Sequence, residues 1–150
     1  MDSRIAQEMK LRFRPVAIVF TDEKPEGALQ FKEGAWGCAV AMLNAAAGRG
    51  QVAVFDRQTF GCLGGGTGLG LGNQVARFPG GIEYLLSVGR GDGFREGEHF
   101  KKTPELAKEV FDNLPMTDIP YTYVIFKPLE QIDPDKETPQ LVCLYCNPDQ

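Results

Sequence analysis

Residues 60–72 read FGCLGGGTGLGLG, in which seven of thirteen residues are glycine and Cys62 stands near the front. A thiolate can attack an electrophile or bind a metal, and glycine lets backbone N–H groups approach a ligand without a Cβ in the way. The same glycines also suit a tight crossing between packed segments. Both interpretations stay open at this point. The candidate ligand contacts in this stretch are Cys62, Gly64, Gly65, Gly66 and Thr67.

Known glycine-rich phosphate loops do not fit this stretch. A P-loop requires a lysine after its last glycine, and no lysine occurs between Arg57 and Lys101. The dinucleotide fingerprint requires glycines at i, i+2 and i+5, and none of the glycines from 61 to 72 begins that spacing. The sequence therefore gives no support for either nucleotide-binding loop.

Trp36 and Cys38 form a second candidate group. The run from Ala35 to Gly48 is rich in alanine, leucine and methionine, which predicts a helix that ends at glycine. Cys38 then lies in the first turn, where free N–H groups and the helix dipole stabilise a thiolate. A small buried thiol on an apolar helix is the competing interpretation. Cys38 and Cys62 are the candidate metal ligands.

Cys143 and Cys146 form a C-x-x-C pattern inside LVCLYC, which we interpret as a strand. Alternation along a strand turns residues i and i+3 to opposite faces, so we expect no joint role for this pair. A four-cysteine zinc or iron–sulfur site would require three separate segments to converge, and the spacing does not predict it. The cofactor stays unassigned.

Charged residues flank the glycine stretch. Asp56, Arg57 and Arg77 are suited to orient an anionic or polar ligand, although solvation at element ends is the ordinary role of such residues. His99 is the single histidine of the chain and lies in a polar segment. Nothing in the sequence brings it near Cys62, so we expect a solvated loop residue.

The elements that must position these residues predict an α+β fold. Apolar runs predict strands over 16–20, 51–55, 121–126 and 140–146, the last two as antiparallel neighbours. The expected helices are 2–11, 35–48, 82–88 and 104–114. The second of these is nearly all apolar, so we expect it to be largely buried. We expect one domain over residues 1–150, with a mainly antiparallel sheet and helices packed against it.

Two further segments carry local signals. Thr103 and Pro104 are well placed to cap the last helix, whose apolar face contains Leu106, Val110 and Leu114. The polar segment GRGDGFREGE, residues 89–98, is expected to be a surface loop.

Composition limits the function classes. The 150 residues are 43% hydrophobic and 24% charged, with a formal net charge of −4, and these values are ordinary for a globular protein. The acidic balance and the absence of a basic stripe argue against a nucleic-acid partner. No apolar segment is long enough to span a membrane or to act as a signal peptide. We expect a cytoplasmic protein, whose cysteines are reduced.

An ordered series of segments resembles a known family, the archaeal and bacterial domain-of-unknown-function family 169. The segments are RPVAIVF, PEGALQFKEGAWGCAV, FDRQTFGCLGGGTGLGLGN, FPGGIEYLLSVGR, DIPYTYVIFKPL and NPDQ. The resemblance extends from about Leu11 onward and includes Cys38 in WGC and Cys62 in FGCLGGG, but not the C-x-x-C pattern. Family members continue for roughly another hundred residues, within ordinary domain sizes. The resemblance thus implies that this chain is the N-terminal part of a longer domain, and it supplies no reaction.

Three functions are compatible with these residues. The leading hypothesis is a protein that binds a small ligand or cofactor where the start of the Cys38 helix meets the Cys62 glycine loop. The second is a thiol-dependent or redox enzyme that uses Cys62 or Cys38. The third is a non-catalytic interaction module. The final strand at 140–146 would leave an open sheet edge, so a homo-oligomer is also an expectation.

Overall fold

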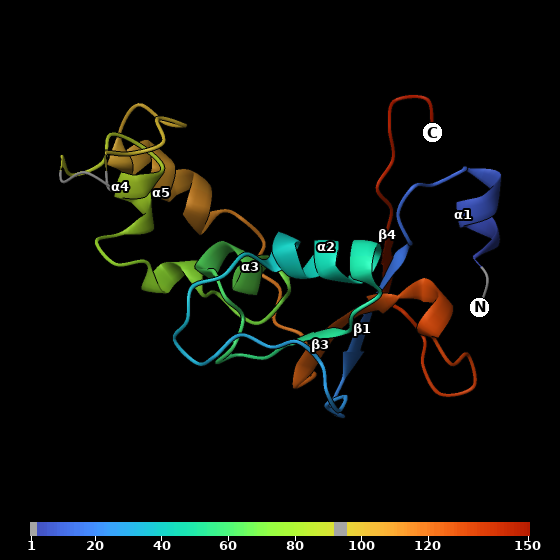
Figure 1. The fold of residues 1–150 in the computed structure, drawn as a ribbon. Coiled ribbons are helices and arrows are strands. Elements are labelled where there is room, and N and C mark those ends of the chain that lie inside the picture. Colours follow the sequence, from blue (N-terminus) through green and yellow to red (C-terminus); the bar gives the residue numbers. More distant parts are fainter. Residues whose placement is uncertain (1–2, 92–95) are drawn as a thin grey trace.

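A four-stranded antiparallel sheet forms the centre of the molecule. The computed structural model describes residues 3–91 and 96–150. The strands are β1 (Val16–Thr21), β2 (Ala53–Phe55), β3 (Tyr123–Pro128) and β4 (Leu141–Cys143), in the spatial order β2-β3-β1-β4. Every neighbouring pair is antiparallel, and the helix Ala39–Arg49 packs against the sheet, while the helices Ile82–Leu85 and Pro104–Asp112 lie together at one end of the molecule (Figure 1). The predicted α+β class with a mainly antiparallel sheet is confirmed.

The apolar run of β1 is continuous because both faces of the sheet are covered. Alternate residues of a strand point to opposite faces. Val16 and Ile18 belong to the cluster that contains the alanines of α2 (Ala39–Arg49), whereas Ala17 and Val19 pack with Ile132 on the other face. The strand therefore contains no polar residue before Thr21.

The strand order corrects one prediction. β3 and β4 are not antiparallel neighbours, because β1 lies between them and pairs with both. The connection from 129 to 140 begins with the short helix η3 (Leu129–Gln131) and crosses the second face of the sheet, where Ile132 is buried. A connection that covers a sheet face in this way does not form a tight hairpin.

Helix α2 begins later and is less buried than the sequence predicts. Gly37 lies against the ring of Phe31, and a Cβ atom there would be 2.0 Å from that ring. Cys38 is still extended, with φ −99° and ψ 121°, so the helix starts at the next residue. Its buried residues are Ala45, Ala46 and Ala47, while Val40 is 55% exposed. The prediction of a largely buried helix is wrong.

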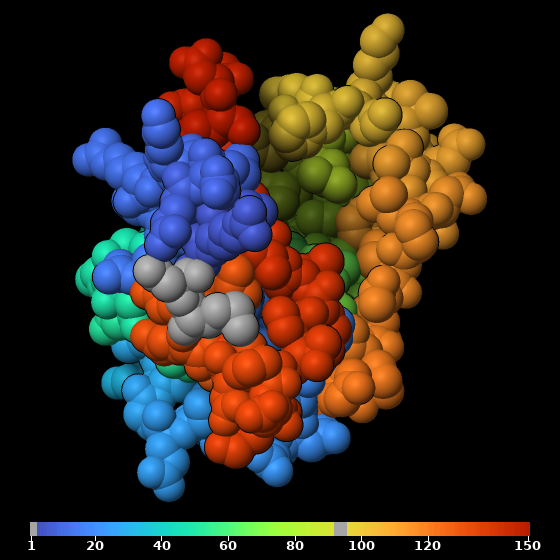
Figure 2. Space-filling model, turned by 90° about the vertical axis from the view of Figure 1, so that its right-hand side faces the viewer, coloured from blue at the N-terminus to red at the C-terminus, as the bar shows by residue number. Residues whose placement is uncertain are grey.

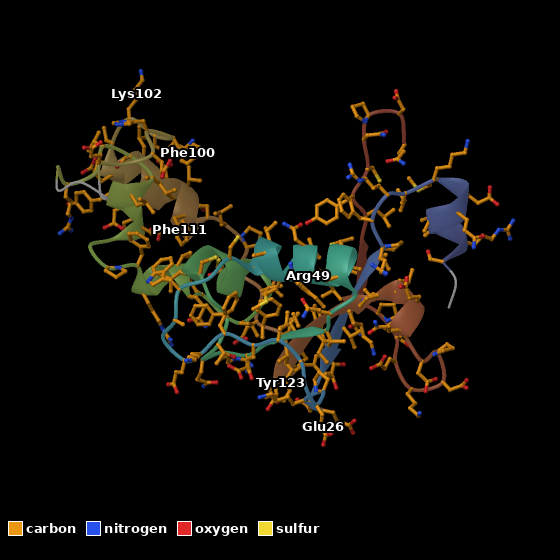
Figure 3. The ribbon with its side chains drawn as sticks, viewed as in Figure 1. Glu26, Arg49, Phe100, Lys102, Phe111 and Tyr123 are labelled. Atoms are coloured by element: carbon orange, nitrogen blue, oxygen red, sulfur yellow. The ribbon has the colours of Figure 1, made fainter. Side chains whose placement is uncertain are left out.

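The remaining helices are short and lie mostly at one end of the molecule. Figure 1 shows α4 and α5 side by side at the end opposite to α1 and both termini. The helices are α1 (Arg4–Glu8), α3 (Leu63–Gly68), η1 (Val75–Arg77), α4 (Ile82–Leu85) and α5 (Pro104–Asp112). In the view of Figure 3, Phe100 and Lys102 mark the α4–α5 end, whereas Arg49 ends α2 near the middle of the molecule.

The cap of α5 is confirmed, but its apolar face is not buried. Thr103 Oγ1 accepts a hydrogen bond from the backbone N–H of Leu106 at 3.4 Å, and Pro104 opens the helix. Ala107 is buried against the α4 side, while Leu106, Val110 and Leu114 remain 42–48% exposed. Residues 92–95 of the predicted loop before this helix lie outside the described residues.

The two ends of the chain pack together. Figure 2 shows the N-terminal segment against residues from about 129 onward on one face of the molecule. Arg14 forms an ion pair with Glu130 at 2.8 Å, and Gln150 donates to the carbonyl groups of Met9 and Lys10. Among the described residues, no helix has the length and apolar content needed to cross a membrane.

Candidate functional site

Two of the four cysteines stand immediately before helices. Cys38 precedes α2 and Cys62 precedes α3, both with extended backbone. Cys38 is exposed and makes no side-chain hydrogen bond to its helix. The Sγ atom of Cys62 accepts a hydrogen bond from the N–H of Gly65 at 3.2 Å. The predicted glycine loop is thus a short helix from Leu63 to Gly68, with the Cys62 thiol as its cap.

The two helix starts are in contact on both sides of their cysteines. On one side, a Cβ atom placed on Gly61 would lie 2.7 Å from the carbonyl oxygen of Gly37. On the other side, a Cβ atom placed on Gly65 would lie 3.1 Å from the Cβ of Ala39 and 2.9 Å from the Sγ of Cys62. The start of α2 and the start of α3 therefore lie in contact with each other.

A surface cavity of about 200 Å³ opens beside these helix starts. Its lining includes the residues on both sides of Cys62 and the three residues that precede Gly37. Trp36 is the most exposed large apolar side chain there, at 66%. The full lining is Gly34, Ala35, Trp36, Gln58, Phe60, Gly61, Leu63, Arg77 and Pro79. The cavity combines aromatic surface with a cation.

Arg77 supplies that cation. It is the last residue of the short helix η1 and is exposed. Within residues 3–91 and 96–150, its guanidinium has no hydrogen-bond or ion-pair partner. An arginine presents a planar array of N–H donors that matches a carboxylate or phosphate. The cavity therefore has one positively charged group free for an anionic ligand.

The other charged candidates are held by the protein itself. Asp56 accepts hydrogen bonds from the backbone N–H groups of Gln58 and Thr59, both at 2.8 Å, and from the side chain of Gln30 at 3.0 Å. It fixes the turn after β2 and is absent from the cavity lining.

Arg57 is also committed to the fold. It donates to Asp118 Oδ1 at 2.7 Å, and to the carbonyl oxygens of Ile119 and Tyr121, both at 2.9 Å. These contacts tie the end of β2 to the segment before β3. Thr67 has a comparable role, because its hydroxyl accepts hydrogen bonds from the N–H groups of Gln74 and Val75.

Several glycines of the stretch are explained by packing. Gly61 has a φ of +81°, and Gly70 has a φ of +78° with a Cβ position 2.7 Å from Ile119. Gly66 is buried against the ring of Phe60, where a Cβ atom would lie at 2.8 Å. Gly64 and Gly68 face open space. Close packing or a left-handed backbone therefore accounts for Gly61, Gly65, Gly66, Gly70 and Gly72, and leaves Gly64 and Gly68 unexplained.

The second cysteine pair does not form a site with the first. Cys143 is half-buried in β4, and Cys146 is exposed beyond the end of the strand. In the described part of the chain, no group of three or more histidine, cysteine and acidic side chains is placed to hold a metal ion. His99 bonds through its backbone N–H to Ser87 near α4, and no contact connects it with Cys62.

The hydroxyl group of Tyr145 is influenced by both Cys143 and Cys38. Its hydroxyl donates to Asn44 Oδ1 on the exposed side of α2. Burial raises the pKa of this hydroxyl above its ordinary value, and the negative charge of the Cys143 and Cys38 thiolates raises it further. Both thiols are therefore within electrostatic range of one phenol.

Of the ligand contacts that the sequence predicts, only Trp36 lines the cavity, and Cys38 and Cys62 lie beside lining residues without lining it themselves. The sequence does not indicate Phe60 or Gln58 as ligand contacts, because neither residue belongs to a recognisable binding motif. The sequence indicates Arg77 only as a charge that flanks the glycine stretch. It reaches the cavity because η1 follows α3 directly and packs against it.

The fold and the cavity define an α+β protein with a tryptophan- and arginine-lined pocket beside two free cysteines. The chain belongs to the DUF169 family, described as "Uncharacterised ArCR", whose model matches residues 4–150. No curated protein and no solved structure matches the chain.

Proposed function

We propose that this protein binds a small anionic ligand in the cavity between Trp36 and Arg77. The observation that carries the proposal is that Arg77 lines the cavity and has no partner among the described residues, whereas Arg57 and Asp56 are bonded to other parts of the fold. The guanidinium would hold the charged group, and the exposed indole would cover a flat apolar part of the ligand.

The size of the cavity sets the class of ligand. About 200 Å³ suits a molecule of roughly ten non-hydrogen atoms, below the 300–1,000 Å³ of drug-sized pockets. A single charged contact and one aromatic face give a fragment-sized ligand a Kd on the order of millimolar. We place this binding in the cytoplasm, where a disulfide is the exception and is transient when it forms.

The proposal is tested by calorimetric titration with benzoate and with its uncharged analogue, benzyl alcohol. We expect benzoate to bind at least about tenfold more tightly, since a charge-assisted hydrogen bond contributes about 1.5–3 kcal/mol. Arg77→Gln should abolish this preference. Arg49→Gln is the matched control, because Arg49 bonds only to Gln51 among the described residues and lies outside the cavity. Equal binding of the two probes would overturn the proposal.

Thiol-dependent chemistry is a second candidate, and one observation favours it. Gly61 and Leu63 both line the cavity, so Cys62 stands between two residues that would contact a ligand. An electrophilic ligand held by Arg77 would then meet a thiol nearby. If neither binding nor thiol reactivity is found, the interaction-module hypothesis remains.

A further inference from the structure

Cys38 and Cys62 lie at the starts of two neighbouring helices, and the proposed ligand site gives them no joint role. All four cysteines are free, Cys38 being exposed and Cys62 half-buried. A disulfide requires Cα atoms about 4.4–6.8 Å apart. Backbone contact between Gly37 and Gly61, and side-chain contact between Ala39 and the Gly65 position, hold the two segments close on both sides of this pair.

We propose that Cys38 and Cys62 form a reversible disulfide that joins the starts of α2 and α3. The Sγ atom of Cys62 and the Cβ atom of Ala39, the residue that follows Cys38, lie 2.9 Å and 3.1 Å from the Cβ position of Gly65. Cys38 is extended, exposed and free of any side-chain bond to its helix, so its thiol can turn toward Cys62 without breaking a capping contact. The proposal concerns the protein without a ligand and is independent of the cavity's occupant.

Cys143 is the competing partner for Cys38, since both thiols lie within range of Tyr145. Cys143 is held in β4 opposite Val16, and its strand pairs with β1 along its whole length. Gly61 contacts Gly37, and the Gly65 position contacts Ala39, so the segments on both sides of Cys62 touch those on both sides of Cys38. The geometry therefore favours Cys62.

The oxidant is a small-molecule disulfide such as glutathione disulfide. The exposed Cys38 thiolate attacks one sulfur of the oxidant, which forms a mixed disulfide and releases one glutathione thiolate. The Cys62 thiolate then attacks the Cys38 sulfur, so that the Cys38–Cys62 bond forms and the second glutathione leaves. The two protons from the protein thiols go to the two leaving thiolates. The protein is oxidised by two electrons, and the glutathione disulfide is reduced.

Trypsin separates the possible partners, which makes the test direct. Cleavage after lysine and arginine places Cys38 alone in peptide 33–49 and Cys62 alone in peptide 58–77. Cys143 and Cys146 remain together in peptide 137–150. The purified protein is incubated with glutathione disulfide, alkylated without reduction, digested and analysed by mass spectrometry, with a reduced sample in parallel.

We expect a crosslinked species of peptides 33–49 and 58–77, lighter than their sum by two hydrogen atoms and lost on reduction. It should be absent from Cys38→Ser and from Cys62→Ser, but retained in Cys146→Ser, the control at an exposed cysteine. A crosslink between 33–49 and 137–150 would overturn the proposal by assigning Cys143 or Cys146 as the partner. Glutathione adducts alone on Cys38 and Cys62 would also overturn it. The peptide analysis of the wild-type protein identifies the partner of Cys38 even if a variant fails to fold.

Discussion

Gly70 and Ile119 are in direct contact, and the backbone N–H of Ile119 donates to the carbonyl oxygen of Gly70 at 2.8 Å. The same glycine has a φ of +78°, and its missing Cβ leaves room for the isoleucine side chain. This contact connects the glycine stretch after β2 with the segment that leads into β3. The glycine stretch is thus built into the core of the fold at one end and into the cavity at the other.

The packing role of the glycines predicts opposite effects at two positions. Gly70→Ala should lower the free energy of unfolding by about 1–3 kcal/mol, because the new methyl group meets Ile119 and the backbone is left-handed. Gly64→Ala should leave stability unchanged or raise it by up to about 1 kcal/mol, since Gly64 lies in α3 and faces open space. Urea unfolding measures both, and equal effects would refute the packing explanation.

Arg57 is expected to support the fold and not the ligand site. Arg57→Met removes one exposed ion pair and two hydrogen bonds to backbone carbonyl groups. The free energy of unfolding should therefore fall by about 1 kcal/mol. Urea unfolding gives the loss, with Arg49→Met as the control for removing an exposed guanidinium. Benzoate binding by the folded fraction should not change. A variant of normal stability that no longer binds benzoate would place Arg57 in the site.

Tyr145 should make stability depend on pH in the alkaline range. Burial first, and then the thiols of Cys143 and Cys38, raise the pKa of its hydroxyl in the folded protein. A group with a raised folded pKa contributes its full stability below the unfolded pKa, about 10 for tyrosine, and this contribution is lost as the pH rises toward the folded pKa. Stability should therefore fall more steeply above about pH 10 in the wild type than in Tyr145→Phe. Unfolding free energies measured across that range test this, and parallel curves would contradict it.

Local signals predicted the elements whose causes are local. The run VAIVF is nearly β1 itself, and Thr103 with Pro104 marks the start of α5. In each case the apolar pattern or the cap requires no knowledge of distant residues. The place of Cys38 at the start of a helix also follows from local sequence, although α2 starts one residue after Cys38.

The features that the sequence did not predict depend on contacts between residues far apart in the chain. Glycine is a poor helix former, so the pattern LGGGTG did not predict α3, which is held by the Cys62 cap and by Gly66 packing on Phe60. The place of β1 between β3 and β4 depends on how the 129–140 segment crosses the sheet. Arg57 looked like a ligand contact because the sequence does not show that residues 118–121 accept its hydrogen bonds.

The sole tryptophan of the chain gives the most direct test of the proposed site. Trp36 is 66% exposed and lines the cavity, so its fluorescence reports on that cavity without interference from another indole. Titration with benzoate should produce a saturable change in the wild type and in Arg49→Gln, and only a weak, non-saturating change in Arg77→Gln. A change of the same size and affinity in Arg77→Gln, or no saturable change in the wild type, would contradict ligand binding between Trp36 and Arg77.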